Sequence, residues 1–531
     1  MSLKILDCTL RDGGYYNNWN FDLAIVQRYL KSMALCDIDI VEIGFKFLSK
    51  DKSIGPFGRC DDKFLDTLDI PEKFKIACML NFKDFQELNE PDLKSKITDI
   101  FKPRELSQIC LVRIAVDFED ALKTKKLAYE LKNLGYEVAL NLMKSNNKKD
   151  SDYESFGEKI NDWSLLKYLY FADSFGNMDS SETLRVYEGL KKHFKGEIGF
   201  HSHNNKGYAL ANSLSVIEKG LNLCDSTIKG MGRGAGNVST ESLLLELIDK
   251  NIKDTNLSYL QDTLKDFENL QEIHKWGPNL YYQFAANKNI HPTFVQTLLL
   301  DPRYDNNQIF EYLVNLSEVE SSSFSIEELK KSIFGKNENY LGSWNPKDWL
   351  KDREVLLIGG GSSVKNYKDK ILNYSKSSKV DIFFLNINNF INQNIGKATI
   401  VGHPIRAMID SYNYKDLSHP IIIPFNSLGK EIKQNLKGLE ILDYGLKLEE
   451  NKYEIGNYAA VMHWPLSAAY AFAIFKQAKA SKIILAGFDG YEEDDLRQQE
   501  MEEVFKKFKL IDKSLEISTI TPSKYDLNFI E

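Results

Sequence analysis

The sequence predicts two α/β units, a (βα)₈ TIM barrel followed by a smaller open sheet of the Rossmann type. Short apolar, β-rich runs recur eight times in the first half of the chain, about 26 to 36 residues apart, with helix-like stretches between them. Strands that alternate with helices in this way are typical of βα units, and eight units make a barrel of ~250 residues. A fresh strand that runs into three glycines at 359–361 predicts the second unit.

The expected barrel strands are short and follow one another evenly. They cover Leu3–Cys8, Asp39–Gly44, Lys75–Leu80, Ile109–Val116, Glu137–Leu142, Tyr168–Ala172, Glu197–His201 and Leu223–Ile228. Helices are expected at Phe21–Leu35, Glu119–Leu134, Ser181–His193, Tyr208–Lys219 and Thr240–Asn251. A doubly wound open sheet is the alternative, and the even spacing and total length favour the barrel.

Four segments follow from this pattern. Residues 1–255 form the barrel and 256–335 a helical extension, whereas 336–352 read as a linker and 353–531 as the second α/β unit. In the second unit we expect strands near Val355–Ile358, Val380–Leu385, Lys397–Val401, Ile421–Pro424 and Lys482–Ala486, with a helix over Pro465–Ala480.

Composition excludes several classes of function. The chain has 531 residues, 43% of them hydrophobic and 27% charged, and a net charge of −8, which argues against a nucleic-acid-binding surface. Its six cysteines lack CxxC spacing, so we expect neither a zinc site nor disulfides. No apolar run reaches ~18 residues and no secretion signal is recognised, so we expect a cytoplasmic protein without a membrane span. We also expect a homo-oligomer.

The stretch Leu6–Gly14 contains the first candidate site. A strand runs directly into Arg11, Asp12 and two glycines, which allow a sharp turn and the close approach of a ligand. An Arg beside an Asp at a strand end suggests an anion clamp next to a metal ligand or an acid/base group. The alternative is a turn with a surface ion pair.

A second constellation ends the seventh predicted strand. His201 and His203 alternate along that strand, so both can point to the same side. Asp12 lies at the corresponding end of the first strand, which a closed barrel separates from the seventh by the eighth strand alone. Two imidazoles and a carboxylate suit Mn²⁺, Fe²⁺, Co²⁺ or Mg²⁺. An ion held by these three ligands keeps open coordination positions, which a 2-oxo acid can fill. The alternative is a histidine pair without a ligand.

Other polar groups lie at the same expected face. Glu42 ends the second strand and either orients Arg11 or is an ordinary exposed glutamate, and 173–177 form a polar cluster after the sixth. The loop 230–237 after the eighth strand is rich in glycine, with Gly232 and Gly234 as candidate substrate-binding positions. Its backbone N–H groups either hold an anion or only form a tight turn.

Together, DxTLRDG at the first strand, Glu42, HxHN at the seventh strand and GxGxxxGN after the eighth resemble the DRE-TIM metallolyases, which include 3-hydroxy-3-methylglutaryl-CoA lyase and 4-hydroxy-2-oxovalerate aldolase. The resemblance covers about residues 4–300. It implies Asp12, His201 and His203 as metal ligands, with Asn237 as a fourth in the lyase branch. It further implies that Arg11 stabilises an enolate and that Glu42 holds Arg11.

The aldolase branch is the more similar one, but its base is missing. Asn279–Phe284 resembles a segment in which a tyrosine lies near the substrate, and Tyr281 is the best match. In this sequence Tyr15 occupies the position at which the family has its histidine base. Either Tyr15 serves, or a residue such as His291 reaches in, or the activity differs. A tyrosine of ordinary pKa is a poor base near pH 7.

The C-terminal unit suggests a nucleotide or nucleotide-sugar site. Its first strand runs into Gly359, Gly361 and Ser362, and a later acidic turn carries Asp489. These features loosely resemble bacterial sialyltransferase-like and flagellin-glycosylation folds and the archaeal pterin diphosphokinase fold. His463 is a candidate glycosyltransferase base or a structural histidine.

The leading expectation is a divalent-metal aldolase that cleaves or forms a 4-hydroxy-2-oxo acid from pyruvate and an aldehyde. Mn²⁺ is the expected metal, with Mg²⁺ and Co²⁺ as alternatives, and the fused second unit suggests surface-glycan biosynthesis. A Claisen-type acyltransferase that uses acetyl-CoA is a second hypothesis, although Gly13-Gly14-Tyr15 departs from the DGEQ pattern of those synthases. A nucleotide-binding or glycosyltransferase-like module with a vestigial barrel is the third.

Overall fold

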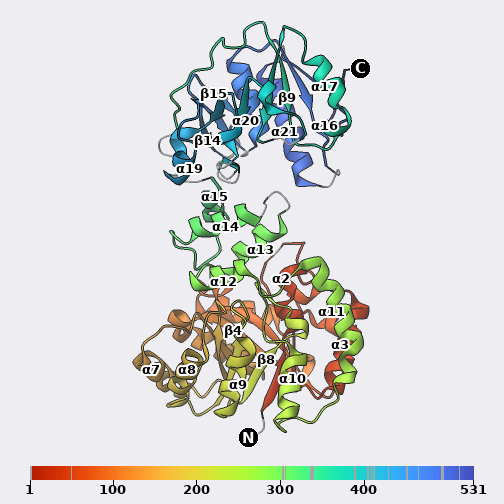
Figure 1. The fold of residues 1–531 in the computed structure, drawn as a ribbon. Helices are drawn as coiled ribbons and strands as arrows, with labels where there is room; N and C mark the ends of the chain where they lie inside the picture. The colour runs from red at the N-terminus through yellow and green to blue at the C-terminus, as the bar shows by residue number, and fades with distance from the viewer. Residues whose placement is uncertain are drawn as a thin grey trace. The chain divides into compact units, whose positions relative to one another are not determined.

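A computed structural model gives the fold of the chain in two compact units, each described here by itself (Figure 1). The first comprises residues 1–300 and 317–324, and the second comprises 301–316 and 325–531. The structure describes residues 3–49, 51–301, 304, 306–334, 340–387, 390–402, 406–407, 410, 413–428, 430–449, 452–463, 466–491, 495–512 and 515–530.

The first unit contains a closed barrel of eight parallel strands in sequence order, in which β1 pairs with both β2 and β8. The TIM-barrel prediction is confirmed, and the open-sheet alternative is wrong for this unit. The strands are β1 (Lys4–Asp7), β2 (Ile40–Phe45), β3 (Lys75–Asn81), β4 (Ile109–Asp117), β5 (Glu137–Met143), β6 (Tyr168–Asp173), β7 (Glu197–Ser202) and β8 (Leu223–Ser226). The eighth is shorter than expected, because the chain turns into a 3₁₀ helix at Ile228–Gly230.

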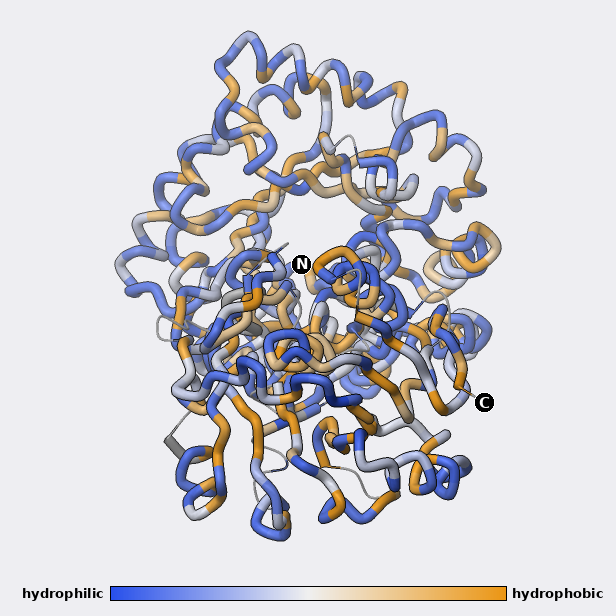
Figure 2. The backbone as a smooth tube through the Cα atoms, turned by 90° about the horizontal axis from the view of Figure 1, so that it is seen from above, coloured by the Kyte–Doolittle hydropathy of each residue, from blue (hydrophilic) through white to orange (hydrophobic). Residues whose placement is uncertain are grey.

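Helices pack around the strands because this contact buries the apolar faces of both. In α3 (Leu23–Leu35), Val26, Leu30 and Met33 are buried, and the Asp22 carboxylate accepts from two backbone N–H groups of the first turn. Figure 2 shows hydrophobic and hydrophilic residues alternating along the backbone, as amphipathic helices require. The other helices up to residue 250 are α1 (Thr9–Asp12), α2 (Gly14–Asn17), α4 (Asp62–Leu65), α5 (Glu90–Ile100), α6 (Lys125–Asn133), α7 (Asp150–Asn161), α8 (Ser180–Lys191), α9 (Ala209–Glu218) and α10 (Thr240–Asp249).

Further helices follow the barrel. Three belong to the first unit: α11 (Gln261–His274), α12 (Leu280–Asn287) and α13 (Pro292–Leu300). Two belong by their contacts to the second unit: α14 (Asn306–Leu316) and α15 (Ile326–Phe334). The helices expected as one extension are therefore divided between the two units. Among the described residues, no helix is both long and apolar enough to cross a membrane.

The second unit is built on an eight-stranded parallel sheet in the order β13-β12-β11-β10-β9-β17-β18-β19. Its strands are β9 (Glu354–Ile358), β10 (Val380–Leu385), β11 (Ala398–Ile400), β12 (Ile421–Ile423), β13 (Ile441–Asp443), β17 (Lys482–Ala486), β18 (Glu516–Thr519) and β19 (Asn528–Phe529). The order reverses beside β9, as in doubly wound folds, and this second parallel sheet confirms the prediction of a Rossmann-like unit.

The elements beside this sheet bury its faces. Every residue from Ala468 to Phe475 of α20 (Ser467–Gln477) is buried in the core. A small sheet joins β14 (Gly445–Leu448), β16 (Ala459–Met462) and β15 (Glu454–Ile455), and the remaining helices are α16 (Ser363–Asn366), α17 (Lys368–Tyr374), α19 (Lys430–Asn435) and α21 (Leu496–Ile511).

The segment expected as a linker packs against the second unit where the structure describes it. The N–H of Gly342 donates to the Tyr458 carbonyl, and that of Trp344 donates to the Asp443 carbonyl. Trp344 also packs against the core of the sheet. Residues 335–339 lie outside the described residues.

Candidate active site and metal centre

The chain leaves β1 in a tight helical turn that buries two charged side chains. Arg11 and Asp12 are 4% and 1% exposed, so the alternative of a surface ion pair is wrong. Arg11 Nη1 donates to Asp12 Oδ1 at 2.5 Å, and the Trp19 indole N–H donates to the Arg11 carbonyl at 2.8 Å. Gly14 packs against the Trp19 ring, where a Cβ would come within 2.1 Å of it. Glycine is therefore needed for the turn that holds Arg11.

Asp12, His201 and His203 meet at one point. Each offers a ligand atom, and the three atoms lie within 4.8 Å of one another. All three side chains are buried, and the two imidazole rings are nearly perpendicular, with centroids 5.0 Å apart. The arrangement arises because β8 alone separates β7 from β1. Nδ1 of His203 is buried without a hydrogen-bond partner.

Asn237 and Gly232 complete this cluster. The Asn237 amide donates to Asp12 Oδ2 at 2.6 Å, while its carbonyl oxygen is buried without a partner. A Cβ at Gly232 would lie 2.7 Å from Asp12 Oδ2, so only glycine lets the loop approach so closely. Buried oxygen and nitrogen atoms that lack partners are what a metal site presents without its ion. The donor set therefore fits a divalent cation.

Asp225 on β8 orients His201. Its Oδ2 lies 2.8 Å from His201 Nδ1. A carboxylate can only accept, so Nδ1 carries a proton, and Nε2 is the nitrogen that lies 3.8 Å from Asp12 Oδ2. A carboxylate that holds the second nitrogen of a histidine in this way is typical of metal-binding histidines.

Two arginines and two carboxylates extend the network into the barrel. Glu42 Oε2 accepts from Arg11 Nε at 2.7 Å and from Arg113 Nη1 at 3.0 Å, and Arg113 Nη2 donates to Asp225 at 2.6 Å. Arg113 also lies over the Tyr170 ring, 4.0 Å from its centroid. Glu42 is fully buried, so the alternative of an exposed glutamate is wrong.

The charges of the cluster suit metal binding. Burial alone would raise the pKa of Asp12, but the Arg11 guanidinium and the two histidines hold it below its usual value. Burial lowers the pKa of His203 to about 3, so its ring is neutral at pH 7. An ionised carboxylate and a neutral imidazole are the forms that bind a cation.

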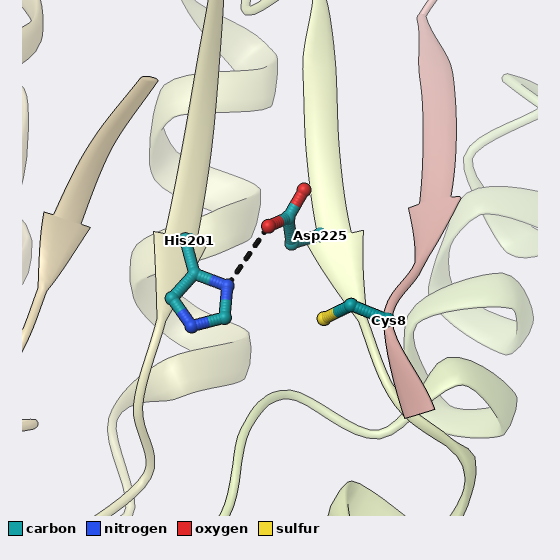
Figure 3. A group of neighbouring side chains, drawn as sticks. All are labelled: Cys8, His201 and Asp225. Atoms are coloured by element: carbon teal, nitrogen blue, oxygen red, sulfur yellow. Dashed lines mark hydrogen bonds and ion pairs between the residues drawn. The ribbon is translucent and has the colours of Figure 1, made fainter. Parts of the chain in front are cut away.

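A neighbouring trio is a weaker candidate. Cys8, His201 and Asp225 also bring one donor atom each within 4.8 Å (Figure 3). However, burial raises the pKa of the Cys8 thiol well above its usual value, and the thiol donates weakly to the Ser226 carbonyl. Asp225 already accepts from Arg113 and His201. Only Oδ1 of Asp225 lacks a partner, so this trio offers a single carboxylate oxygen and no thiolate.

A cavity of about 320 Å³ lies at the carboxyl ends of β3 to β6, the face that carries active sites in such barrels. Tyr15, Arg233 and His291 line it, and Asp117, Lys144, Ser174 and Phe175 are among the other lining residues. Burial raises the pKa of Tyr15 and lowers that of His291 to about 2, so both side chains are neutral at pH 7.

The remaining expected residues are placed differently. Tyr281 is not among the residues that line this cavity. Its neighbour Tyr282 is buried, with its hydroxyl 3.3 Å from that of Tyr16, which donates to the Gly234 carbonyl. Gly234 has φ +72°, a conformation that favours glycine.

In the second unit, Gly359, Gly361, Ser362 and Asp489 lie together. Asp489 accepts from the Ser363 N–H at 3.0 Å and from the Ser362 hydroxyl at 3.2 Å, and Gly361 N–H donates to the Gly487 carbonyl. A cavity of about 590 Å³ is lined by Gly360, Gly361 and Asp489. The Asp489 carboxylate places negative charge on the loop, and nucleotide binding there stays a prediction.

Three charged residues of the first unit escape motif analysis. Arg113 and Asp225 lie within apolar strands, and the presence of a charged residue in such a run is the sequence signal that could have identified them. Arg233 lies within the glycine loop, where its spacing matches no ligand motif. The partners of Arg113 and Asp225 are far away in sequence, so only the closed barrel identifies these two residues.

Comparison with known proteins supports this assignment of the barrel. The HMGL-like family profile matches residues 2–273. The oxaloacetate decarboxylase of Mycobacterium tuberculosis is 26% identical over 245 residues, which cover 46% of this chain and 69% of that protein. A 4-hydroxy-2-oxovalerate aldolase of Geobacillus genomosp. 3 is 26% identical over 263 residues, with 46% and 70% covered.

A solved structure is also similar. The N-terminal domain of a candidate aldolase from Bacteroides vulgatus has 32% sequence identity and a TM-score of 0.50, and the match covers 58% of this chain and 99% of that domain. The predicted resemblance to the DRE-TIM metallolyases is confirmed. Since the family match spans just over half of the sequence, this chain belongs to the HMGL-like family.

Proposed function

We propose that the barrel unit is a divalent-metal-dependent lyase that cleaves the C3–C4 bond of a 4-hydroxy-2-oxo acid, or forms it in reverse. Pyruvate is the constant product and an aldehyde is the other. The observation that carries this proposal is the buried Asp12, His201 and His203 cluster beside Arg11. Relatives named 4-hydroxy-2-oxovalerate aldolase support it.

Asp12, His201 and His203 would hold the metal, with the unpartnered carbonyl oxygen of Asn237 as a fourth donor. A bound divalent ion supplies a Lewis acid that polarises the 2-oxo group. Mixed nitrogen and oxygen donors suit Mn²⁺, with Mg²⁺ and Co²⁺ as alternatives.

Arg11 stabilises the charge that develops on the substrate. Asp12 and Glu42 hold its guanidinium, and its Nη2 is buried without a partner. When the C3–C4 bond breaks, its electron pair stays on the pyruvate half and negative charge collects on the enolate oxygen. A donor held rigidly before the reaction stabilises this charge without reorganising, usually the largest catalytic effect.

His291 and Tyr15 carry out the proton transfers. The neutral His291 ring accepts the proton of the C4 hydroxyl, which becomes the aldehyde carbonyl. The Tyr15 phenol, whose raised pKa keeps it protonated, gives a proton to C3 of the enolate and so completes pyruvate. The proton that His291 took returns to Tyr15 through solvent. Both side chains line the same cavity, which supports this division of roles.

Decarboxylation of a 2-oxo diacid is a second candidate. It breaks the same bond but releases CO₂, so no hydroxyl proton has to be removed. The strongly lowered pKa of His291 makes it a weak base, which favours this reaction. The similarity to a protein named oxaloacetate decarboxylase supports it as well.

Pyruvate release measured with lactate dehydrogenase tests both candidates. Manganese-loaded protein is given 4-hydroxy-2-oxo acids in one series and oxaloacetate in another, and Asp12→Asn with equal Mn²⁺ corrects for uncatalysed decay. Enzyme-dependent pyruvate in either series identifies the reaction, and its absence from both overturns the proposal. Thiol release from acetyl-CoA with a 2-oxo acid would instead favour the acyltransferase hypothesis. A glycan-biosynthetic role and a homo-oligomeric state stay predictions.

A further inference from the structure

Arg233 occupies an unusual place in the glycine loop that follows β8. It lies between Gly232, which packs against Asp12, and Gly234, whose carbonyl accepts from Tyr16. Its half-buried side chain lines the 320 Å³ cavity, and its guanidinium carbon is 5.5 Å from the centroid of the Tyr15 ring. The loop therefore presents a positive charge directly to the cavity.

Within the part of the chain that the structure describes, this guanidinium has no ion-pair partner of its own, because the Asp12 carboxylate that acts on it electrostatically is already paired with Arg11. Its Nε is buried without a hydrogen-bond partner, and no carboxylate forms an ion pair with it. The other two arginines of the site differ. Arg11 pairs with Asp12 and Glu42, and Arg113 pairs with Glu42 and Asp225. Charged groups shielded from water are normally paired, so a half-buried guanidinium whose buried Nε lacks a partner points to an anionic ligand in the cavity.

The other charges of the cavity do not satisfy Arg233. Lys144 Nζ lies 3.2 Å from Asp117, so these two charges compensate each other. Lys83 and Asp84 are exposed and of opposite sign. Arg233 is the charge that remains, and its planar fork of donors matches a carboxylate or a phosphate.

Position separates this anion from the carboxylate of the pyruvate half. Asp12, His201 and His203 do not line the cavity, whereas Arg233 does. The pyruvate half has Arg11 and the metal cluster for its own charge. A ligand of Arg233 therefore belongs to the part of the substrate that extends into the cavity.

We infer that Arg233 binds a second anionic group, a carboxylate or a phosphate, on the half of the substrate that leaves as the aldehyde. This inference rests on the proposed function and names its substrate class: a 2-oxo acid with a negatively charged distal group. The planar guanidinium over the Tyr15 ring would fix that group while the C3–C4 bond lies near Arg11.

Paired aldehydes test the inference in the direction of synthesis. Manganese-loaded enzyme and pyruvate receive butanal or succinic semialdehyde, which differ in a terminal carboxylate, and glyceraldehyde or its 3-phosphate, which differ in a phosphate. We expect kcat/KM to favour one anionic aldehyde by about 10- to 100-fold, as a charge-assisted hydrogen bond would. The pair that shows the preference identifies the anion.

Variants connect that preference to Arg233. Arg233→Met should bring the ratio close to one, and Arg233→Lys should keep part of it. Arg28→Met is the matched control, because Arg28 is an exposed arginine that pairs with Asp266 on the barrel surface. It should leave the ratio unchanged. Equal kcat/KM values for both members of each pair in the wild type, or a preference that survives in Arg233→Met, would overturn the inference.

A binding measurement separates this inference from the proposed function. Calorimetry compares 2-oxoglutarate with 2-oxopentanoate, which lacks the distal carboxylate and, like it, has no C4 hydroxyl to react. Tighter binding of the diacid that is lost in Arg233→Met supports the anion site even if no aldehyde reacts. Aldol activity without any anion preference, in turn, supports the lyase and refutes the role of Arg233.

Discussion

Asp225→Asn is the sharpest test of the metal centre, because it changes one charge and almost no volume. In the structure a single oxygen, Oδ2 of Asp225, receives both the His201 Nδ1–H at 2.8 Å and an Arg113 N–H at 2.6 Å. The amide keeps one accepting oxygen but loses the negative charge. Its NH₂ group, if turned toward His201, would oppose the Nδ1 proton and disturb the tautomer.

Two effects of different size follow. Loss of a carboxylate behind a metal-binding histidine typically weakens metal affinity about 10- to 100-fold, which is about 1.4–2.7 kcal/mol. Breaking a buried ion pair costs about 3–5 kcal/mol, and we expect the lower end here because the amide oxygen still accepts from Arg113. The affinity for the metal and the free energy of unfolding should therefore both fall, by amounts that can be measured separately.

The two effects are measured separately. The Kd for Mn²⁺ comes from competition with a chelating dye, and the free energy of unfolding comes from urea titration of metal-free protein. Arg113→Met is the control, because it breaks the same ion pair, together with the one to Glu42, and leaves the contact between Asp225 and His201. It should lower stability with a smaller change in Kd. An unchanged Kd in Asp225→Asn, or an equal loss in the control, would refute the argument.

The same variant has a defined pH dependence. Burial would raise the pKa of Asp225, but Arg113 and His201 outweigh it and lower that pKa below its usual value. A carboxylate with a lowered pKa stabilises the fold above its unfolded pKa and loses this contribution as the pH falls through its folded pKa. The stability gap between wild type and Asp225→Asn should thus be constant at neutral pH and narrow below about pH 4.

Other predictions follow from the same site. Arg11→Lys should lower kcat about 10²- to 10³-fold, since the single ammonium cannot contact Asp12, Glu42 and the enolate together; an unchanged kcat would contradict this role. Tyr15→Phe should slow pyruvate release while leaving the Kd for Mn²⁺ unchanged, and equal losses of both would make Tyr15 a structural residue. Removing metal with a chelator should lower Tm, and Mn²⁺ at 100 times its Kd should restore about 2.7 kcal/mol. Asp12→Asn should abolish that restoration, and a Tm gain that persists in it would place the metal elsewhere.

Much of the barrel and part of its site could be read from local sequence. The predicted and observed strand positions agree within a few residues, because runs such as Ile109–Val116 are apolar on both faces. Such runs are typical of strands that are buried on both sides. The pairing of His201 with His203 follows from the two-residue repeat of a strand. Glu42 could be placed at a strand end, but not shown to be buried.

The network behind the proposed metal ligands could not be found in this way. Arg113 and Asp225 lie on different strands, and each is satisfied only by a partner that barrel closure brings to it. Arg233 could not be found in this way either, because its importance depends on the absence of an ion pair between it and any described carboxylate. Such an absence concerns every neighbour in space and leaves no mark in the local sequence.

The sequence by itself determined the repeating strand-and-helix pattern, the order of the motifs, and the donor types at the ends of β1, β7 and β8, because these depend on backbone periodicity and residue chemistry. Tertiary structure decided which donors meet. Closure places β8 between β1 and β7, so Asp12 approaches His201 and Asp225 can hold the far side of that ring. Contacts between distant segments depend on strand register and on the burial of charge, which exist only in the folded barrel.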